Sequence, residues 1–589
     1  MTMETTATAI DYQSDETANA ARPRAWPAVA LVAAFWAVHF ALSMIDLPLF
    51  NRFLGMLFST GLLMIIFLGW WSIDRRGRRG ERLAGVMAWL IAGVAVGLLT
   101  IKSSNVMALI LTAMPWAFTA WAAWIWIGRG LPVRTRKRGL VVVMALAWGV
   151  FALLRMDGLT GSGDMTMAWR WSKTPEELYL AELARRGGGT ATTTATISVT
   201  ETTADWPGFR GPRRDGVVRG LAIATDWHAA PPKMLWKQRV GPGWSSMCVV
   251  GGRLYTQEQR GEVEAVVCRD AVSGAETWAH LEGARFSEAM AGPGPRATPT
   301  FAEGRIYAMT ARGLLLCLDA VTGEKAWVRD VAAESAAPMP IWGFCASPLV
   351  SGGNVVVFAG GETKGVIAYD GRTGAPAWSA PAGKVSYGSV QEGTVGDESQ
   401  LLVWSDRGVV AMDPQSGAIR WDQAVGSASG MPRSLQPHTV NGAVLVAAED
   451  DAGAARLDVS HDGGTWRPVQ KWKTTQFRPS FNDFVVKGDY LYGLSGGALA
   501  CVDLRDGKVK WRKGRYGGGQ VLLLDDQSLL LVQCESGEVA LVAAKPDGLQ
   551  ELARIPAIEG KTWNHPAVAR GRLYVRNGEE MACFELTAK

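Results

Sequence analysis

The chain has 589 residues, with 60 Lys plus Arg against 55 Asp plus Glu and a formal net charge of +5. This even balance argues against nucleic-acid binding driven by bulk positive charge. Hydrophobic residues make up 48% of the chain and charged residues 20%, which excludes a largely disordered protein. The 26 Trp and 68 Gly are well above ordinary usage, so both residue types are expected to serve a repeated structural purpose.

The N-terminal half is predicted to lie in a membrane. Residues 1–25 are polar and show no signal-peptide pattern, so we predict a disordered cytoplasmic N-terminus. A bilayer-spanning helix needs about 20 apolar residues, and four uncharged stretches meet this need: 26–45, 53–73, 83–101 and 103–128. A fifth stretch, 139–154, is shorter, although flanking arginines can snorkel to the interface. Residues 26–155 are therefore predicted to form an anchoring bundle of five transmembrane helices.

The orientation of this bundle follows from its positive charges. They cluster before the first stretch and in the second and fourth loops, at Arg22, Arg24, Arg75, Arg76, Arg78, Arg79, Arg82, Arg129, Arg134, Arg136, Lys137 and Arg138. The positive-inside rule then places the N-terminus in the cytoplasm of a bacterial inner membrane. After five crossings, everything beyond Arg155 lies in the periplasm. This conclusion reverses if the fifth stretch does not cross.

A linker is predicted over residues 156–204. Thr174, Pro175 and the two acids that follow are typical of a helix start, and we expect the helix to run to about Arg186. Three glycines and a Thr-rich tract without apolar periodicity come next, which indicates a flexible tether.

From Asp205 to the C-terminus one pattern recurs: a β-rich run, an Asp, a Gly turn and then a Trp. The full copies carry Asp270/Trp278, Asp319/Trp327, Asp370/Trp378, Asp413/Trp421 and Asp503/Trp511, and a degenerate copy carries Asp458/Trp466. The Trp residues of the first four copies are 49, 51 and 43 residues apart. This period predicts a propeller with one four-stranded sheet per blade, in which Asp and Gly make a tight turn and Trp covers the neighbouring blade.

Two weaker copies bring the count to eight blades, so residues 205–589 are predicted to form an all-β eight-bladed propeller. The strand 233–240, with Trp236 in the Trp position, can complete the sheet begun by 567–586. Joining the chain ends in one blade would close the ring and remove an open edge.

The repeat resembles the PQQ-type (pyrroloquinoline quinone) propeller family, as does the opening segment Asp205-Trp206-Pro207-Gly208-Phe209-Arg210-Gly211. The overall layout resembles membrane-bound PQQ glucose dehydrogenases, which pass electrons to membrane quinone. This resemblance implies the fold, and with it a possible cofactor, PQQ with Ca²⁺ or Mg²⁺.

The sequence also departs from the quinoprotein enzymes. It has no adjacent Cys-Cys pair, the blades leave little room for the long inserts that wall the cofactor, and the metal candidates are limited to Asn482, Asp483 and Glu288. The compact ring is similar to the propeller lipoprotein of the outer-membrane β-barrel assembly machinery, which binds protein partners.

All seven cysteines follow residue 247. Cys268, Cys317, Cys501 and Cys583 stand two residues before the acidic position of their repeats, so we expect small buried strand residues there. The cysteine spacing shows no zinc or haem-attachment pattern.

A candidate site is predicted at one mouth of the central channel, where the residues before each innermost strand should converge. It comprises Arg296, Trp342, His438, Asn482, Asp483, Gln520, Trp563, Asn564 and His565. Arg296 could bind a carboxylate, Trp342 or Trp563 could stack on a ring, and Asp483 or His565 could act as a catalytic base. The alternative is that these residues plug the channel and satisfy each other.

Two functions remain open from the sequence. The first is a membrane-anchored periplasmic propeller that binds a protein partner or a small polar ligand. The second is a PQQ-dependent dehydrogenase that passes electrons from a sugar or alcohol to membrane quinone.

Overall fold

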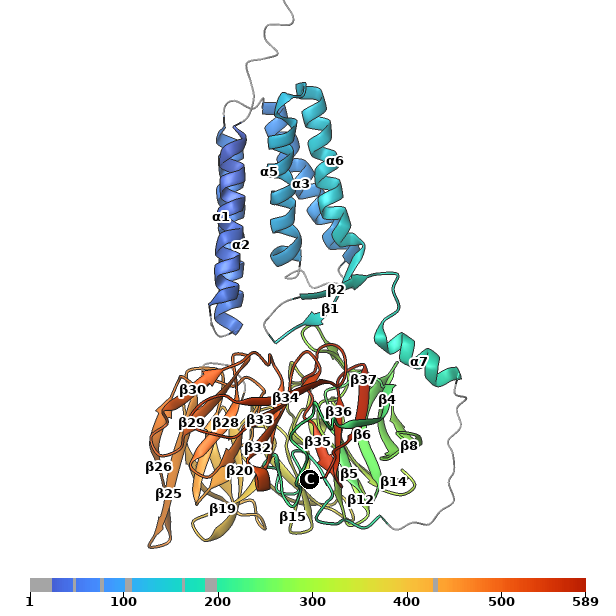
Figure 1. The fold of residues 1–589 in the computed structure, drawn as a ribbon, viewed down its shortest axis with the longest axis vertical. Helices are drawn as coiled ribbons and strands as arrows, with labels where there is room; N and C mark the ends of the chain where they lie inside the picture. The colour runs from blue at the N-terminus through green and yellow to red at the C-terminus, as the bar shows by residue number, and fades with distance from the viewer. Residues whose placement is uncertain are drawn as a thin grey trace, which may run out of the picture. The chain divides into compact units, whose positions relative to one another are not determined.

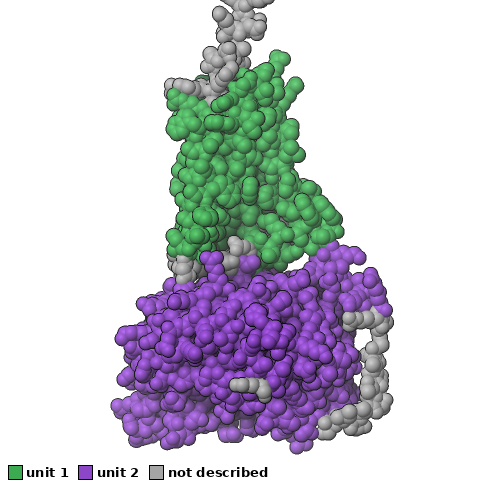
Figure 2. Space-filling view, in the orientation of Figure 1, with its two compact units in different colours: residues 1–159, 163–172 green, residues 160–162, 173–589 purple. Residues whose placement is uncertain are grey.

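The computed structural model describes residues 24–45, 49–74, 79–100, 109–161, 165–185, 199–426 and 433–588. The chain divides into two compact units, residues 1–159 with 163–172 and residues 160–162 with 173–589, coloured separately in Figure 2. The first unit is mainly helical and the second is mainly β. Most of the predicted N-terminal tail, residues 1–23, lies outside the described residues.

The first unit is a helical bundle with an aromatic core. Its helices are α1 (Ala25–Met44), α2 (Leu49–Ile73), α3 (Arg79–Thr100), η2 (Leu109–Ala113), α5 (Met114–Ile127), η3 (Gly128–Gly130) and α6 (Val133–Ala152) (Figure 1). Phe67 of α2 contacts Phe118 and Trp121 of α5, with ring centroids 4.9 and 5.4 Å apart. Trp89 of α3 and Trp148 of α6 are buried in the same core. Many of the tryptophans of this half are therefore used in helix packing.

Four helices of the described part are long and apolar enough to cross a membrane: Ala25–Met44, Arg52–Ile73, Arg79–Thr100 and Leu109–Gly130. The predicted count of five is wrong by this measure. The fifth stretch does form a helix, α6, but α6 begins at Val133 and therefore includes Arg134, Arg136, Lys137 and Arg138. Its apolar part is correspondingly short.

One of these charges is buried and neutralised inside the bundle. Arg136 of α6 donates to both carboxylate oxygens of Glu81 on α3, at 2.9 and 3.0 Å. Both side chains are at most 5% exposed. A buried charge is tolerated where a partner and good hydrogen-bond geometry compensate for lost hydration, so this pair lets α3 and α6 pack closely at their charged ends.

The segment after the bundle contains the antiparallel pair β1 (Leu154–Leu159) and β2 (Met165–Trp169) and then helix α7 (Pro175–Arg185). The predicted helix start is confirmed. Thr174 Oγ1 accepts from the Glu177 amide at 3.1 Å, and the Glu177 carboxylate accepts from the Thr174 amide at 2.7 Å, which is a capping box. The Gly-rich and Thr-rich tract from 186 to 198 lies outside the described residues.

Helix α7 packs on the propeller through a buried tyrosine. Tyr179 is 3% exposed, and its hydroxyl donates to Glu258 Oε1 at 2.6 Å. Glu176, in the first turn, accepts from the Gly261 amide at 2.9 Å and from Arg285 at 2.9 and 3.0 Å. The helix is thus a fixed part of the propeller unit.

The prediction of an eight-bladed propeller is confirmed (Figure 1). Blades 1 to 4 are β5 (Cys248–Val250), β6 (Arg253–Arg260), β7 (Val263–Asp270) and β8 (Glu276–Glu282); β11 (Thr300–Ala302), β12 (Arg305–Met309), β13 (Leu314–Asp319) and β14 (Lys325–Asp330); β15 (Leu349–Ser351), β16 (Asn354–Phe358), β17 (Val366–Asp370) and β18 (Pro376–Ala380); and β19 (Gln391–Val395), β20 (Glu398–Ser405), β21 (Gly408–Met412) and β22 (Ile419–Gln423).

Blades 5 to 8 complete the ring. They are β23 (His438–Val440), β24 (Ala443–Ala447), β25 (Ala454–Asp462) and β26 (Thr465–Thr474); β27 (Val485–Lys487), β28 (Tyr490–Ser495), β29 (Ala498–Asp503) and β30 (Val509–Lys513); β3 (Val217–Val218), β31 (Gln520–Leu524), β32 (Leu529–Gln533), β33 (Glu538–Ala543) and β34 (Glu551–Pro556); and β35 (Ala567–Ala569), β36 (Arg572–Arg576), β37 (Glu580–Glu585) and β4 (Lys233–Arg239). Short extra elements are β9 (Ser287–Glu288), β10 (Gly292–Pro293), α8 (Val331–Ser335) and η4 (Asp525–Gln527).

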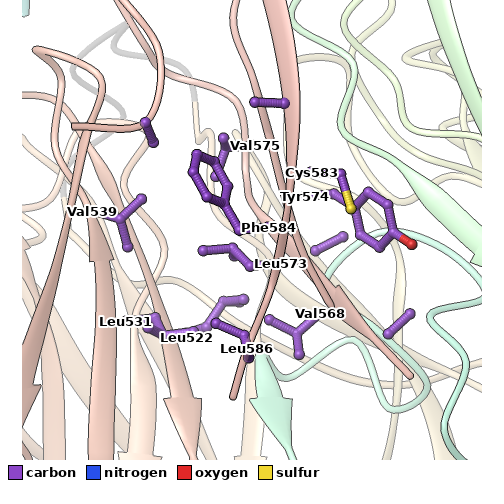
Figure 3. Packing of buried hydrophobic residues seen from close by; sticks show 14 of the residues in the cluster. Leu522, Leu531, Val539, Val568, Leu573, Tyr574, Val575, Cys583, Phe584 and Leu586 are labelled. Atoms are coloured by element: carbon purple, nitrogen blue, oxygen red, sulfur yellow. The ribbon is translucent and has the colours of Figure 1, made fainter. Parts of the chain in front are cut away.

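The chain ends meet in blade 8, as predicted. Strand β4 pairs antiparallel with β37, and Trp236 lies opposite Cys583. Blades 7 and 8 then share one apolar core, in which Leu522, Leu531 and Val539 lie near Leu573, Val575 and Phe584 (Figure 3). The ring is therefore closed by backbone pairing and by side-chain burial together.

The repeated motif forms the predicted turn. Asp270 Oδ1 accepts from the amides of Val272 and Ser273 at 3.1 and 2.7 Å, and Gly274 has φ 75°. An added Cβ at Gly274 would lie 2.8 Å from the Trp236 ring, which belongs to the preceding blade. The same relationship recurs for Gly323 with Trp278, Gly374 with Trp327 and Gly417 with Trp378. Each of these tryptophans therefore covers the turn of the next blade.

The degenerate copy in blade 5 behaves differently from the prediction. Strands β25 and β26 continue past Asp458, and Trp466 lies near the tip of this long hairpin with its ring stacked 4.0 Å from that of His461. Trp472 instead takes the motif position, because its Nε1 donates to Leu504 O at 2.7 Å and its ring lies against Gly507 of blade 6.

Candidate functional site

The central channel of the propeller is occupied by the chain's own lead-in segment, residues 205–223. This segment contacts the innermost strands of several blades in turn. Trp206 bridges Val249 of blade 1, the Pro207 carbonyl accepts from Phe301 of blade 2 at 2.8 Å, and β3 runs parallel to β31 of blade 7. At the end of the segment, Ile223 bridges Ala588, which follows β37 and lies away from the innermost strand of blade 8. The lead-in is therefore a plug built into the fold.

Two arginines anchor this plug. Arg210 is fully buried, lies 3.2 Å from the Asp483 carboxylate and donates to the carbonyls of Asp215 and Phe484. Arg214 donates to the carbonyls of Pro348 and Ser347 at 2.9 and 3.2 Å. Both have positive φ, 60° and 55°, which non-glycine residues adopt only when their surroundings hold them there.

Asp483 and His565, the predicted catalytic candidates, lie beside this anchor. Asp483 accepts from His438 Nε2 at 2.8 Å in addition to pairing with Arg210. Burial raises the pKa of Asp483, but the positive charge of Arg210 and the hydrogen bond with His438 outweigh burial and hold that pKa well below its usual value. Its carboxylate is thus an ion-pair partner of the plug.

His565 is buried, and its ring meets the Phe209 ring edge-on at 4.9 Å. Burial, with the nearby positive charge of Arg210, lowers the pKa of His565 to about 3. The imidazole is therefore neutral at neutral pH and a weak base. The position beside Phe209 makes it a packing partner of the lead-in.

The predicted amide residues join neighbouring blades. Asn482 donates to Gly519 O at 2.6 Å, Gln520 donates to Trp563 O at 2.9 Å, and Asn564 donates to Ser245 O at 2.7 Å. All three are almost fully buried. Each amide satisfies a backbone carbonyl that would otherwise lack a partner, which stabilises the inner ring.

Arg296 and Trp342, two further residues of the predicted site, each have partners within the propeller. Arg296 pairs with Glu288 at 2.8 Å, donates to Gly294 O at 2.9 Å and covers the Phe286 ring at 4.9 Å. Trp342 contacts the Tyr387 ring with centroids 4.9 Å apart. The guanidinium of Arg296 is thus already bound by a carboxylate of the same segment, which connects blades 1 and 2.

A further group at the mouth was not fully identified from the sequence. Trp244, Phe481 and Trp563 form what we call the mouth aromatic cluster, with Trp563 4.9 Å from Phe481 and 5.0 Å from Trp244. Lys561 Nζ lies 4.4 Å from the Trp563 ring and 5.1 Å from the Trp244 ring. The predicted site residues included Trp563 but not Lys561, which stands two residues earlier on the same loop.

The described residues do not fit a PQQ–metal site. Among them, no group of three or more His, Cys, Asp or Glu could hold a metal ion. Asp483 is held by Arg210 and His438, and Asn482 by Gly519. Trp244 and Trp563 contact each other, so no slot for a planar ring lies between them. A pocket between blades 5 and 6, lined by Arg456, Asp489 and Arg505 among others, has a volume of only about 20 Å³.

The seven cysteines are all free in the structure. Cys268, Cys317, Cys501 and Cys583 are fully buried and lie opposite Trp278, Trp327, Trp511 and Trp236 in their sheets, which confirms a shared structural position. Burial raises the pKa of Cys583 to about 12, so this thiol is unreactive at neutral pH.

The propeller is similar to several known proteins. A family model described as outer membrane protein assembly factor BamB matches residues 223–362 and 264–513. Among solved structures, BamB from Moraxella catarrhalis has 17% identity and a TM-score of 0.44, covering 60% of this chain and 99% of its own. The quinohemoprotein alcohol dehydrogenase from Comamonas testosteroni has 13% identity and a TM-score of 0.47, covering 70% and 84%. No curated protein sequence matches the chain. The family model and the repeated turn together identify the second unit as a β-propeller of the PQQ-type repeat family.

Proposed function

We propose that this chain is an interaction module of the bacterial inner membrane, in which apolar helices anchor a periplasmic PQQ-like propeller. The observation that carries this proposal is the plugged channel. Arg210 and Arg214 of the lead-in bind carboxylate and carbonyl groups that an enzyme of this fold would need to keep available. The rim of the mouth then remains as the accessible surface for a protein partner or a small polar ligand.

The rim offers apolar side chains to a partner. Met339, Ile341 and Val385 are 44%, 77% and 46% exposed, and they flank the Trp342–Tyr387 contact. Exposed apolar residues that gather beside aromatic rings are typical of protein interaction surfaces. The family model that matches the propeller carries the description of an assembly factor. This description also supports a binding role.

Site-specific photocrosslinking tests this proposal in cells. A photoreactive phenylalanine analogue at Ile341 should form a discrete adduct with a partner. The matched control is Val272, which is 50% exposed but lies in the β7–β8 turn, at the end of blade 1 away from the mouth. Equal crosslinking at both positions, or none at Ile341, would contradict the assignment of the mouth as the binding surface.

The competing function is that of a PQQ-dependent dehydrogenase. Purified protein should be incubated with micromolar PQQ and Ca²⁺ or Mg²⁺, then assayed for cofactor absorbance and for dye reduction with sugars and alcohols. We expect neither signal, because Asp483 and Asn482 are engaged by the chain itself. PQQ binding with dye reduction, both lost in an Asn482→Ala variant that unfolds like the wild type, would establish the enzyme function instead.

The periplasmic location depends on α6. Leu140, Met144 and Trp148 of this helix are buried in the core of the bundle, and its buried Arg136 is paired with Glu81. Four crossings alone would leave the propeller on the side of the N-terminus, so a periplasmic propeller requires that α6 crosses as well. A reporter that is active only in the periplasm should therefore be active when fused after Lys589, whereas activity of a cytoplasm-only reporter would reverse the orientation.

A further inference from the structure

The mouth aromatic cluster holds an ammonium group in an arrangement suited to cation binding. Lys561 Nζ lies over two indole rings, at 4.4 Å from Trp563 and 5.1 Å from Trp244. Phe481 contacts Trp563 from another loop, with centroids 4.9 Å apart. A cation within about 6 Å of an aromatic face is attracted by the negative charge of the ring face, most strongly for Trp. Two indole rings from two loops therefore face the ammonium group, and Phe481 from a third loop packs against one of them.

Carboxylates reinforce this preference for positive charge. Glu535 accepts from Trp563 Nε1 at 2.9 Å and from the Gly518 amide at 2.8 Å, so its carboxylate is held at the base of the cluster. Glu288 lies on the other side, where it pairs with Arg296 and where the neighbouring Met290 carbonyl is 3.4 Å from Lys561 Nζ. An anionic ligand would meet two acids here, whereas a cation would be stabilised.

Burial makes the charged form of Lys561 less favourable at this position. Burial lowers the pKa of Lys561 to about 8, because the rings remove water from the ammonium group. At the same time Trp244, Phe481, Trp563 and Lys561 are all only partly buried, so the cluster remains open to solvent. A side chain that is desolvated yet reachable can be displaced by a ligand of the same charge.

We propose that the mouth aromatic cluster is a binding site for an organic ammonium group, and that Lys561 fills it until such a ligand displaces the lysine. The ligand class comprises quaternary ammonium groups of the choline type and the primary ammonium of a lysine side chain. The proposal goes beyond the interaction role, because a small ammonium ligand would bind whether or not a protein docks at the rim.

Calorimetric titration of the full chain, in a detergent without choline groups, tests the proposal. Choline is the main probe, and 3,3-dimethyl-1-butanol is its uncharged analogue of nearly the same shape. N-acetyl-lysine amide tests the primary ammonium and so distinguishes the two sources of the group. We expect choline to bind and the neutral analogue to bind at least about tenfold more weakly, since the attraction depends on charge.

Removing the competing lysine should strengthen binding. In Lys561→Ala, choline should bind about tenfold more tightly than in the wild type, because the site no longer has to be vacated first. Adding Trp563→Leu to Lys561→Ala should abolish this gain. A melting transition in each variant close to that of the wild type shows that the propeller is folded.

The pH dependence gives an independent measurement on the unmodified chain. Among the residues that the structure describes, the charged groups that act on Lys561 include Glu288, Glu535, Glu579 and Arg296. Because the pKa of Lys561 is about 8, raising the pH from 7 to 9 should remove its charge and tighten choline binding in the wild type. Lys561→Ala should show no such change. The proposal is overturned if choline fails to bind Lys561→Ala, or if choline and its neutral analogue bind equally. Those results would leave the crosslinking test of the rim unaffected.

Discussion

The guanidinium of Arg210 lies 3.2 Å from the carboxylate of Asp483, and neither side chain is more than 2% exposed. Arg210 belongs to the lead-in segment and Asp483 precedes the innermost strand of blade 6, so this pair joins two parts of the chain that are far apart in sequence. It converts the middle of the channel from a cavity into a packed and charged core.

Loss of Arg210 should destabilise the propeller strongly. Arg210→Met leaves the Asp483 carboxylate buried without its main counter-charge, and breaking one side of a buried pair costs about 3–5 kcal/mol. Arg219→Met is the matched control, since Arg219 lies in the same segment but pairs with Asp215 at the surface, where an ion pair contributes at most about 1 kcal/mol. Thermal unfolding of the full chain measures both. Equal shifts would mean that the Arg210–Asp483 pair is not important for stability.

Helix α7 should loosen when its buried hydroxyl is removed. Tyr179→Phe keeps the ring but deletes the 2.6 Å hydrogen bond to Glu258, a buried carboxylate that Arg260 also contacts. A hydrogen bond to a charged group contributes about 1.5–3 kcal/mol, so amide exchange in α7 should accelerate by at least tenfold. Glu182→Gln, which alters a carboxylate 4.0 Å from Arg239, should change exchange little. Unchanged exchange in Tyr179→Phe would show that packing alone holds the helix.

Glu264 should make the propeller less stable as the pH rises. Its side chain is 3% exposed, Oε1 has no hydrogen-bond partner among the described residues, and burial raises its pKa to about 7. The folded state therefore holds a proton that the unfolded chain releases near its ordinary pKa of about 4.3, so stability falls between these values as the pH increases. Glu264→Gln should match the wild type near pH 4 and exceed its unfolding free energy by on the order of 2 kcal/mol at pH 8. A constant difference across this range would contradict the raised pKa.

Two substitutions separate the stability cost of crowding the tryptophan ring from the cost of a left-handed backbone at a turn glycine. Gly323 and Gly304 have the same φ of 75°, but an added Cβ would meet the Trp278 ring at 2.6 Å only at Gly323 and would meet nothing within 4 Å at Gly304. Gly304→Ala should cost about 1 kcal/mol through its left-handed backbone. Gly323→Ala should cost about 1–3 kcal/mol more, because the ring must shift. Denaturant unfolding compares them, and equal losses would mean that the Trp278 contact is readily rearranged.

Much of the fold followed from local patterns. The Asp–Gly–Trp spacing predicted the blades because the turn depends on neighbouring residues, and Trp236 in the closing strand was recognisable by the same spacing. The Cys position opposite each Trp was visible because strand alternation is also local. The prediction failed for Trp466, since the number of residues in a hairpin does not by itself reveal which tryptophan reaches the next blade.

The candidate site was only partly predictable. Its residues were chosen because each precedes an expected innermost strand, but their partners come from segments distant in sequence. Nothing in the lead-in indicates that Arg210 would reach Asp483, because the segment has no periodic pattern. Lys561 was missed because a lone lysine in a loop looks like an ordinary surface charge.

The sequence by itself determined the two-part organisation, the repeat and the closure of the ring, because these depend on hydrophobic length, turn chemistry and spacing along the chain. The tertiary structure alone decided what fills the channel and what lies at its mouth. Those outcomes depend on burial, which pairs Arg210 with Asp483 and places Lys561 over two tryptophan side chains. Burial is a property of the assembled propeller rather than of any one segment.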